Sequence, residues 1–565
     1  MLARSRLKIR PGSLYSSSHC YRTTLTSSHH GLPRRASLSS SSKQSTTTTS
    51  RTKIATAAAV VATAAASACY VNYNKTGLIH NDTRPVEPSK LPPNYAAVTG
   101  PTVELPRPFS TKSTRMLDDH DVSSRIREHE ESYTVDRNSG VTRFDVDQLA
   151  SNPQIEDDFV VKVVNVDFAD GKHDWCFFGV FDGHGGWNTS AKLRELLVPY
   201  VARELTATIE PSKVSSAYSL ESPENASKID EAIQSAFLRL DDDIVKKPFN
   251  YLLENPSMPA SAEMLMPAMS GSCALLSVYD AATSTLRVAC TGDSRAVWGH
   301  RNQSGEWTAT PLSYDQCGRN QSEAQRIRSE HPGESGVIER GRVLGRLEPT
   351  RAFGDARYKL PQNMINNAVR MFFGRVAPDN SVSPPYVTAK PDVVTAKVQP
   401  GDFLILATDG IWDEISSTDA VQLVVEWVKK HEVEHKGLPP PGVHSHVRKG
   451  GILAPISDHS DVKIVNDTAA FSERMRGGHA RADSELRRST APQKRFKGMF
   501  VIEDDNAAAH IIRNSLGGAD KDRTAMLLSI PPGSSRRYRD DMTCLVVFFG
   551  DKTEQEASGK ITPIK

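Results

Sequence analysis

Acidic residues are missing from the first 80 positions, and the first of them is Asp82. Before residue 54 the chain instead carries many arginines and lysines among serines and threonines. A basic, serine-rich segment without acids is typical of a mitochondrial targeting sequence. We predict that residues 1–53 have this role and form no folded domain; the alternative is a disordered basic tail without a targeting role.

Cysteine is also scarce, with seven residues in 565, and no two of them form a C-x-x-C pair. The spacing therefore supports neither a zinc site nor a disulfide framework. A C-x₅-R motif with a reactive thiolate is absent, and so is a D-x-D-x-D-G calcium loop. These absences argue against cysteine-based catalysis and against a calcium site of that loop type.

A strong excess of one charge is missing as well, because the net charge is only +2. A protein dedicated to nucleic acid would need a broad basic face, so we expect no nucleic-acid partner. With 38% apolar and 24% charged residues, most of the chain can form a packed core.

One uncharged run, IATAAAVVATAAASACYV at residues 54–71, is long enough to cross a bilayer about 30 Å thick. Its many alanines make insertion marginal. Two interpretations stay open: an inner-membrane anchor, which we favour, or an alanine-rich extension of the targeting segment. The sequence does not decide on which side of the membrane an anchored catalytic part would lie.

The remaining chain divides by composition. Residues 72–113 contain many prolines and polar residues and are predicted to be a linker. We expect the folded catalytic domain at 114–550, interrupted by a basic, Gly/Pro-punctuated insertion loop at about 431–498. Residues 551–565 form a predicted C-terminal tail.

Within the predicted domain, strands and helices follow from hydrophobic periodicity. Continuous apolar runs, which are typical of strands buried on both faces, occur at 159–166, 176–181, 273–280, 285–292, 402–410 and 543–550. Amphipathic helical patterns occur at 228–247, 418–430 and 506–518. The strands and helices do not alternate strictly, so the pattern indicates a layered α+β fold.

Acidic residues recur at the ends of these apolar runs. They are Glu156 and Asp157 in SNPQIEDDF, Asp182 in FDGHGG, Asp293 in TGDSRAV, Asp409 in ATDGIWD and Asp540 in YRDDMT. A single aspartate after a strand is usually a turn or helix cap, but so many sites fit turns alone poorly. Carboxylates are the ligands that Mg²⁺ and Mn²⁺ prefer, so the pattern favours a divalent-metal centre.

The ordered motifs IEDD, FGVFDGHGG, SGSCALL, TGDSRAV, RAFGD, ATDGIWD and RDDMT resemble the metal-dependent type 2C protein serine/threonine phosphatases. The resemblance covers about residues 115–550. It implies a β-sandwich of two antiparallel sheets flanked by helices, four layers in the order α-β-β-α. It also implies a centre of two Mg²⁺ or Mn²⁺ ions at one end of the sandwich.

Carried over position by position, the resemblance assigns metal contacts. It implies that Asp182 bridges two metals, that the carbonyl of Gly183 binds one, and that Asp409 and Asp540 are further direct ligands. Glu156 and Asp157 are expected to hold metal-bound waters, with Asp157 nearer the metals. Asp293 resembles the acid that, together with Asp409, recruits a third and weaker metal.

His184 resembles the general acid that protonates the departing seryl or threonyl oxygen. A lone histidine in a turn is more often structural, but this one stands between a predicted metal ligand and Gly185 and Gly186. Two cations about 3.5–4 Å apart lower the pKa of a shared water toward 7. The reaction then needs no covalent enzyme intermediate.

One position departs from the wider family: Asn152 occupies the site of an arginine that grips the substrate phosphate. An amide gives neutral donors in place of a charged, bidentate fork, so phosphate binding there should be weaker. The substitution is typical of the pyruvate dehydrogenase phosphatase branch, as is Asp541 after the last metal acid. Asn320 and Glu323 match a segment of that branch and are expected to support the site; the alternative is a solvated helix.

The branch and the acid-free amino terminus together predict a mitochondrial enzyme, in the matrix or associated with the inner membrane. Its predicted substrate is the phosphoserine of the pyruvate dehydrogenase E1α subunit. One alternative is a general mitochondrial phosphoprotein phosphatase. A second is a pseudophosphatase that binds a partner, which would be expected to have lost some metal acids, whereas Asp182, Asp409 and Asp540 are all present.

Overall fold

The computed structural model describes residues 115–151, 153–216, 223–435, 464–466, 500–551 and 558–564. These residues belong to one compact unit that contains Ser113–Lys565. The predicted targeting segment, anchor and linker, residues 1–113, lie outside the described residues. Among the residues that are described, every helix is too short or too polar to cross a membrane.

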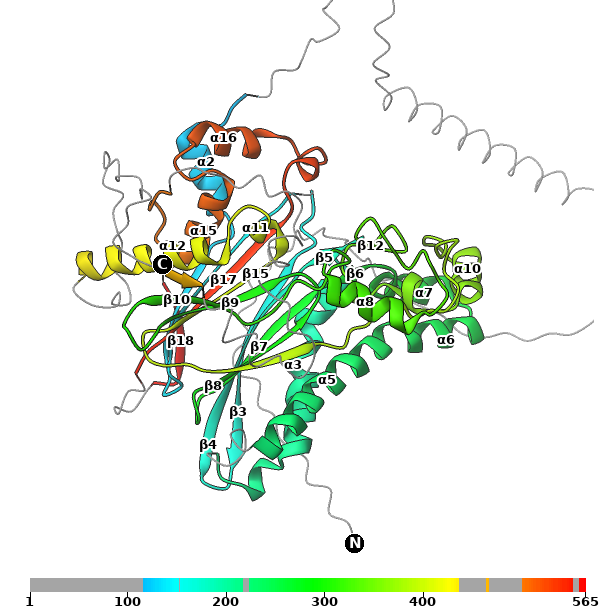
Figure 1. Cartoon of the computed structure of the whole chain (residues 1–565), viewed down its shortest axis with the longest axis horizontal. Helices are drawn as coiled ribbons and strands as arrows, with labels where there is room; N and C mark the ends of the chain where they lie inside the picture. Colours follow the sequence, from blue (N-terminus) through cyan, green and yellow to red (C-terminus); the bar gives the residue numbers. More distant parts are fainter. Residues whose placement is uncertain are drawn as a thin grey trace, which may run out of the picture. The chain divides into compact units, whose positions relative to one another are not determined.

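Two antiparallel sheets form the centre of the fold (Figure 1). Among the described residues, the larger sheet has eight strands in the order β16 (Ile464–Asn466), β10 (Trp307–Pro311), β9 (Arg295–Arg301), β15 (Phe403–Ala407), β17 (Met542–Phe549), β2 (Val141–Leu149), β1 (Glu131–Asp136) and β18 (Lys560–Pro563). The smaller has five, in the order β14 (Asp392–Lys397), β8 (Thr285–Thr291), β7 (Ala274–Asp280), β4 (Gly171–Phe181) and β3 (Asp158–Phe168). Within both sheets all neighbouring strands are antiparallel except β10 and β16.

Helices cover the outer face of each sheet, so the predicted four-layer sandwich is confirmed (Figure 1). The five-stranded sheet is covered by α3 (Asn188–Ile209) and α5 (Pro223–Ile244), with α6 (Lys246–Glu254), α7 (Met258–Met269), α9 (Ala356–Lys359) and α10 (Gln362–Met371) beside them. The eight-stranded sheet is covered by α12 (Ser417–His435) and α15 (Ala507–Leu516), with α2 (Asp119–Ile126), α11 (Asp409–Trp412) and α16 (Lys521–Ser529) nearby. Among the described residues there are also two short 3₁₀ turns, η3 (Pro211–Lys213) and η4 (Ser535–Arg537).

Most of the continuous apolar runs are explained by burial on both faces, as in β4, whereas the run at 159–166 lies in the edge strand β3 and is only partly buried. In β4, Trp175, Phe177 and Phe181 pack against the helices, whereas Cys176 and Phe178 point into the core between the sheets. Successive side chains of a strand point to opposite faces, so a strand with two buried faces has no polar positions to alternate with.

Smaller elements lie beside the sandwich. A three-stranded ribbon has the order β13 (Phe353–Gly354), β6 (Gly271–Ser272) and β5 (Gly183–His184). A separate small core contains α8 (Gln321–Glu330), β11 (Ile338–Glu339) and β12 (Arg342–Val343).

Several predicted boundaries were wrong. The run at 402–410 is a strand only to Ala407, after which Asp409 begins α11. The helix at 228–247 divides at Val245 into α5 and α6. Strand β18 lies beyond residue 550, where we expected the domain to end, and pairs with β1. Strand β16 lies inside the predicted insertion 431–498 and pairs with β10.

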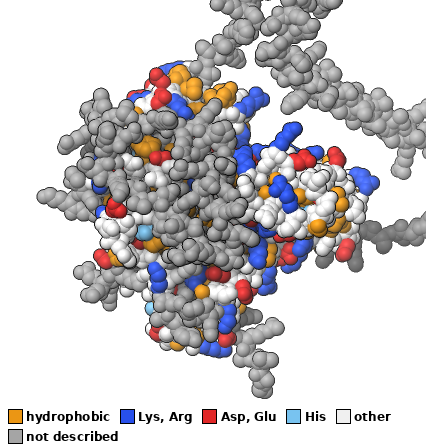
Figure 2. All heavy atoms as spheres, in the orientation of Figure 1, with side chains coloured by type: hydrophobic (Ala, Val, Ile, Leu, Met, Phe, Trp, Pro, Cys, Tyr) orange, Lys and Arg blue, Asp and Glu red, His pale blue; other side chains and the backbone are white. Residues whose placement is uncertain are grey.

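The described surface carries both signs of charge. On the face in Figure 2, Lys and Arg side chains occur alongside Asp and Glu side chains. This mixture agrees with the small net charge of +2.

Candidate metal centre

The predicted acids meet at one edge of the sandwich because the strands are antiparallel. In such a pair, the end of one strand lies beside the beginning of the next. Phe181, the last residue of β4, pairs with Asp158, the first of β3. In the other sheet, Ala407 at the end of β15 pairs with Cys544 near the beginning of β17. Acids that follow one strand and precede another are therefore brought to the same edge.

Three carboxylates form the centre of this group. Asp182, Asp293 and Asp409 each offer an oxygen atom, and these atoms all lie within 4.8 Å of one another. Asp182 follows β4, Asp293 follows β8 and Asp409 begins α11. These three residues are distant in the sequence and lie together in the structure, whereas their roles as metal ligands stay predictions.

Burial and mutual repulsion make this cluster unfavourable as a set of bare charges. Burial, and then the charges of Asp157 and Asp293, raise the pKa of Asp182 well above its usual value. Burial and the charge of Asp182 likewise raise the pKa of Asp409. Burial also raises the pKa of Asp293 to about 6. Hard cations neutralise such a set of oxygen donors, so the residues present fit Mg²⁺ or Mn²⁺.

Asp157 is held beside the three carboxylates by two hydroxyl groups. Its Oδ2 accepts hydrogen bonds from Thr408 Oγ1 at 2.9 Å and from Thr543 Oγ1 at 2.8 Å. Burial, and then the charge of Asp541, raise the pKa of Asp157 to about 8. Asp293 is held in a similar way, because the thiol of Cys273 donates to its Oδ1 at 3.1 Å.

Glu156 and Gly183 are in direct contact through the backbone. A Cβ atom added at Gly183 would overlap the carbonyl oxygen of Glu156, so only glycine fits there. The same carbonyl accepts a hydrogen bond from Ser190 Oγ at 2.5 Å. Burial and the charge of Asp541 raise the pKa of Glu156. The Glu156 carboxylate is not part of the group of three.

Asp540 lies next to the group without belonging to it. A Cβ added at Gly410, the neighbour of Asp409, would be 3.2 Å from Cβ of Asp540. The carboxylate of Asp540 forms an ion pair with Arg536. The contact with Arg536 was not predicted from the sequence.

His184 has a partner that the sequence did not reveal. Its Nε2 lies 2.6 Å from Oδ2 of Asp355. Burial alone would lower the pKa of His184, but the Asp355 charge and hydrogen bond outweigh it, and the pKa is raised. The ribbon β5–β6–β13 brings the two residues together, since His184 ends β5 and Asp355 follows β13. The RAFGD motif contained this signal, although it gave Asp355 no role.

Gly271 makes this contact sterically feasible. A Cβ at position 271 would overlap both His184 Nε2 and Asp355 Oδ2. Gly185 and Gly186, which follow His184, have positive φ values of 68° and 130°, a conformation that glycine adopts at little cost.

Asp541 organises the loop that leads to Glu156. Its Oδ1 accepts from Ser151 Oγ at 2.8 Å, and its Oδ2 accepts from the backbone N–H of Glu156 at 2.8 Å. A carboxylate at this position can accept donors on both oxygens, whereas an asparagine could accept on only one. Asn152 lies outside the described residues, so its predicted role in phosphate binding stays a prediction.

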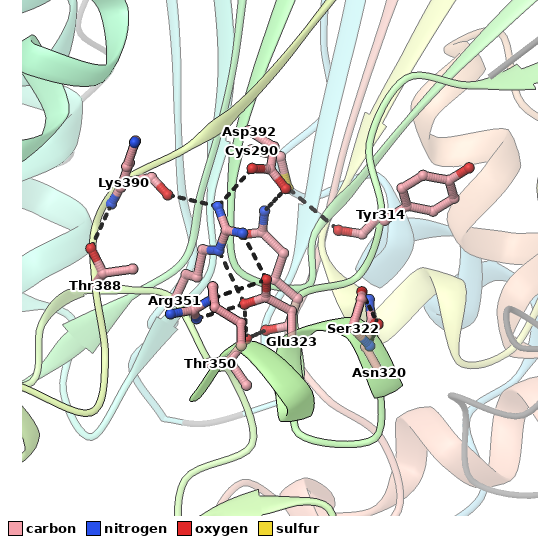
Figure 3. A network of polar contacts seen from close by, with 12 residues as sticks. Cys290, Tyr314, Asn320, Ser322, Glu323, Thr350, Arg351, Thr388, Lys390 and Asp392 are labelled. Atoms are coloured by element: carbon pink, nitrogen blue, oxygen red, sulfur yellow. Dashed lines mark hydrogen bonds and ion pairs between the residues drawn. The ribbon is translucent and has the colours of Figure 1, made fainter. Parts of the chain in front are cut away.

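Asn320 and Glu323 belong to a network next to the centre (Figure 3). Asn320 caps α8 by accepting from the N–H of Ser322 at 3.1 Å. Glu323 is only 5% exposed, so the alternative of a solvated helix is wrong for this residue. Arg351 donates to both Glu323 oxygens, at 2.6 and 3.0 Å, and also to Asp392 Oδ1 at 2.8 Å.

This network fixes the segment that ends at Asp355. Burial alone would raise the pKa of Glu323, but Arg351 and Arg326 lower it to about 2. Arg351 stands four positions before Asp355 in the RAFGD motif. Glu323 can therefore support the site in the following way. It holds Arg351, and Arg351 begins the segment that ends at Asp355, the residue in contact with His184.

Comparison with known proteins identifies the family. The model of the protein phosphatase 2C family matches residues 131–438. A protein phosphatase 2C homolog of Schizosaccharomyces pombe is 40% identical, over 76% of this chain and 85% of its own length. The mitochondrial [pyruvate dehydrogenase [acetyl-transferring]]-phosphatase 1 of Saccharomyces cerevisiae is 38% identical, over 80% of this chain and 76% of its own. Among solved structures, a serine-threonine phosphatase 2C of Toxoplasma gondii matches 72% of this chain and 95% of its own with 18% identity and a TM-score of 0.36.

The chain belongs to the protein phosphatase 2C family. It is a metal-dependent serine/threonine phosphoprotein phosphatase. The acids that a partner-binding pseudophosphatase would be expected to lose are present, and two of them, Asp182 and Asp409, belong to the group described above.

Proposed function

We propose that this phosphatase hydrolyses phosphoserine of the mitochondrial pyruvate dehydrogenase E1α subunit and so reactivates that enzyme. The observation that carries the chemistry is the convergence of Asp182, Asp293 and Asp409 within 4.8 Å. The substrate is inferred from the yeast relative, whose name states that it acts on pyruvate dehydrogenase.

The cation-binding residues follow from the donor set. Asp182, Gly183, Asp409 and Asp540 would hold two Mg²⁺ or Mn²⁺ ions, with Glu156 and Asp157 beside them and Asp293 contributing to a third. When bound, such ions lower the pKa of water and neutralise phosphoryl charge. The hydroxyls of Thr408 and Thr543 orient Asp157 for this task.

His184 is the proposed general acid for the departing seryl or threonyl oxygen. Asp355 raises its pKa and so favours the protonated form that can donate. Because the 2.6 Å contact is made by Nε2, Nδ1 remains for proton transfer. Asp355 thus acts through His184 and is a positioning residue.

The first experiment tests the proposed metal ligands Asp182 and Asp409. Asp182→Asn and Asp409→Asn should each abolish release of phosphate from a phosphoserine peptide in the presence of Mn²⁺, because each removes a shared anionic ligand. Asp379→Asn is the matched control, since the Asp379 side chain is 97% exposed, and should leave the rate unchanged. Full activity of either variant, or activity that is indifferent to a chelator, would contradict the proposed centre.

The substrate requires a separate experiment. Phosphoproteomics of mitochondria that lack the protein should find E1α hyperphosphorylated. Unchanged E1α with another mitochondrial phosphoprotein accumulating would favour the alternative, a general mitochondrial phosphatase. Fractionation of the full chain would show whether residues 54–71 anchor it to the inner membrane or leave it in the matrix.

A further inference from the structure

The segment 531–541, which precedes β17, is attached to the loop before β3 by several hydrogen bonds. Ser535 Oγ donates to the carbonyl oxygen of Ser151, and Arg539 Nη2 donates to that of Ala150 at 2.6 Å. Asp541 accepts from Ser151 and Glu156, as described above. The 3₁₀ turn η4 is therefore held beside the acids of the metal centre.

Arg536, in the middle of this turn, is the basic residue that reaches the acid group. Its guanidinium forms the ion pair with Asp540. Asp540 lies next to the group of Asp182, Asp293 and Asp409, so the guanidinium lies at the rim of the acid cluster.

Arg536 is also open to solvent. Its side chain is 41% exposed, and that of Asp540 is 28% exposed. Arg539 differs, because it is only 7% exposed and donates to the backbone of Ala150. Arg536 is therefore accessible to a substrate that approaches the centre, whereas Arg539 serves to hold the loop.

We propose that Arg536 binds the phosphoryl group of the substrate at this centre. This inference rests on the proposed phosphatase function and adds a residue to it. A guanidinium carries five N–H donors in a planar fork that matches a phosphate dianion, more donors than one oxygen of Asp540 can accept. A cationic side chain at the rim of the centre also favours the approach of the anion.

The sequence lacks a charged phosphate-binding side chain at the position where the family resemblance would place one. Position 152, for which a phosphate-binding arginine would have been expected, is asparagine and offers no charge. Arg536 follows Ser535, which contacts Ser151, so η4 meets the loop one residue away from position 152. The charged contact would come from the carboxyl-terminal segment instead of the amino-terminal loop.

Arg536→Met, Arg536→Lys and the control Arg537→Ala test the proposal. Arg537 is the neighbouring exposed residue of the same turn. With saturating Mn²⁺, Arg536→Met should raise both the KM for a phosphoserine peptide and the inhibition constant of inorganic phosphate about 10-fold or more. Arg536→Lys should fall between the wild type and Arg536→Met, because it keeps the charge but loses the fork. Arg537→Ala should match the wild type.

Two direct binding measurements separate this role from others. Calorimetric titration of the Mn²⁺-loaded protein with inorganic phosphate should show weaker binding in Arg536→Met. Titration with Mn²⁺ alone should show affinity that is equal or higher, because a positive charge beside Asp540 has been removed. An unchanged phosphate affinity, or a loss of Mn²⁺ affinity that accounts for the higher KM, would overturn the proposal.

Different results would overturn the proposed phosphatase function and the proposed role of Arg536. A wild-type chain that releases no phosphate from the peptide with Mn²⁺ would overturn the proposed function itself. An active wild type whose Arg536→Met variant binds inorganic phosphate as tightly would overturn only the role of Arg536. Arg536→Lys keeps the test valid should Arg536→Met fold poorly.

Discussion

His184 depends on one carboxylate for both its charge and its orientation. Oδ2 of Asp355 lies 2.6 Å from Nε2 of His184; His184 ends β5, and Asp355 directly follows β13 of the same ribbon. Asp355 is therefore the main group that raises the pKa of the proposed proton donor, and Asp293 and Glu156 add to its effect. Substrates with different leaving groups can test whether the two residues act in proton donation.

His184→Gln should slow hydrolysis of a phosphoserine peptide by about 10² or more, because an alkoxide is a poor leaving group without a proton donor. The same variant should slow p-nitrophenyl phosphate much less, since nitrophenolate leaves without protonation. Asp355→Asn should show the same pattern with a smaller loss. Steady-state kcat for the two substrates measures this, and equal losses on both would reject the acid role.

The buried carboxyl of Asp409 lowers the stability of the folded protein, and its proposed role as a metal ligand explains why it is there. Burial and neighbouring acids raise its pKa, so the folded protein loses stability as pH rises above the ordinary aspartate value and this carboxyl must ionise. A residue of this kind is expected to stabilise the fold when neutralised.

In a chelator at neutral pH, Asp409→Asn should increase the free energy of unfolding by about 1 kcal/mol. Mn²⁺ should raise the melting temperature of the wild type by mass action, and should have little effect on the variant. Thermal unfolding with and without Mn²⁺ measures both effects; Asp379→Asn serves as control. A variant that is less stable in chelator and still shifted by Mn²⁺ would contradict the assignment.

At the scale of elements, the positions of the side chains in the site depend more on short connecting segments than on the long strands of the sandwich. The ribbon β5–β6–β13 has only two residues in each strand, yet it carries His184 and leads to Asp355. Beside it, α8 contributes Glu323, whose bonds to Arg351 hold the segment leading to Asp355 (Figure 3). The stability of this connection can be tested through pH.

Glu323→Gln should destabilise the protein by about 3 kcal/mol at pH 7, because it breaks a buried ion pair. The folded pKa of Glu323 is lowered to about 2 from 4.5. Its contribution is therefore complete above pH 4.5 and is lost as the pH falls from 4.5 toward 2.

Urea unfolding of wild type and Glu323→Gln between pH 3 and pH 8 would test this. The difference in unfolding free energy should stay constant above about pH 5.5 and narrow below it. Glu330→Gln on the same helix, where the side chain is 50% exposed, should cost less than about 0.5 kcal/mol. A difference independent of pH would mean that the Glu323 charge is not what stabilises the segment.

At the scale of the whole molecule, three hydrophobic cores stack through the sandwich. One lies between the two sheets, and the other two lie between each sheet and its helices. The acids gather where the strands of both sheets end, so the inter-sheet core fixes their distances. The metal centre depends on the packing of the two sheets.

Phe178→Ala removes an aromatic ring from the core between the sheets, where Phe178 is 1% exposed and lies beside Phe144. We expect a loss of about 3–5 kcal/mol, since the cavity cannot close fully. Leu238→Ala, at an α5 position that is 38% exposed, should cost about 1 kcal/mol or less. Urea denaturation of the two variants measures the difference, and equal costs would mean that the inter-sheet core is not rigidly packed.

The sequence alone determined the strands and helices with long periodic patterns and the acids that follow them. Apolar runs such as the one in β4 indicate strands that are buried on both faces. It also singled out His184 as a candidate proton donor, and that role stays a prediction. These features depend on residues close together in the chain or on strand direction.

Only the tertiary structure decided which side chains touch. The pairs His184–Asp355, Arg536–Asp540 and Glu323–Arg351 have partners that periodicity does not predict, because their distances depend on how loops pack. Strand β18 was missed for a similar reason: its residues are mostly exposed, and its place at the edge is fixed by pairing with β1. Local sequence patterns indicate which residues are buried. Contacts between polar loops form only when the two sheets have packed together.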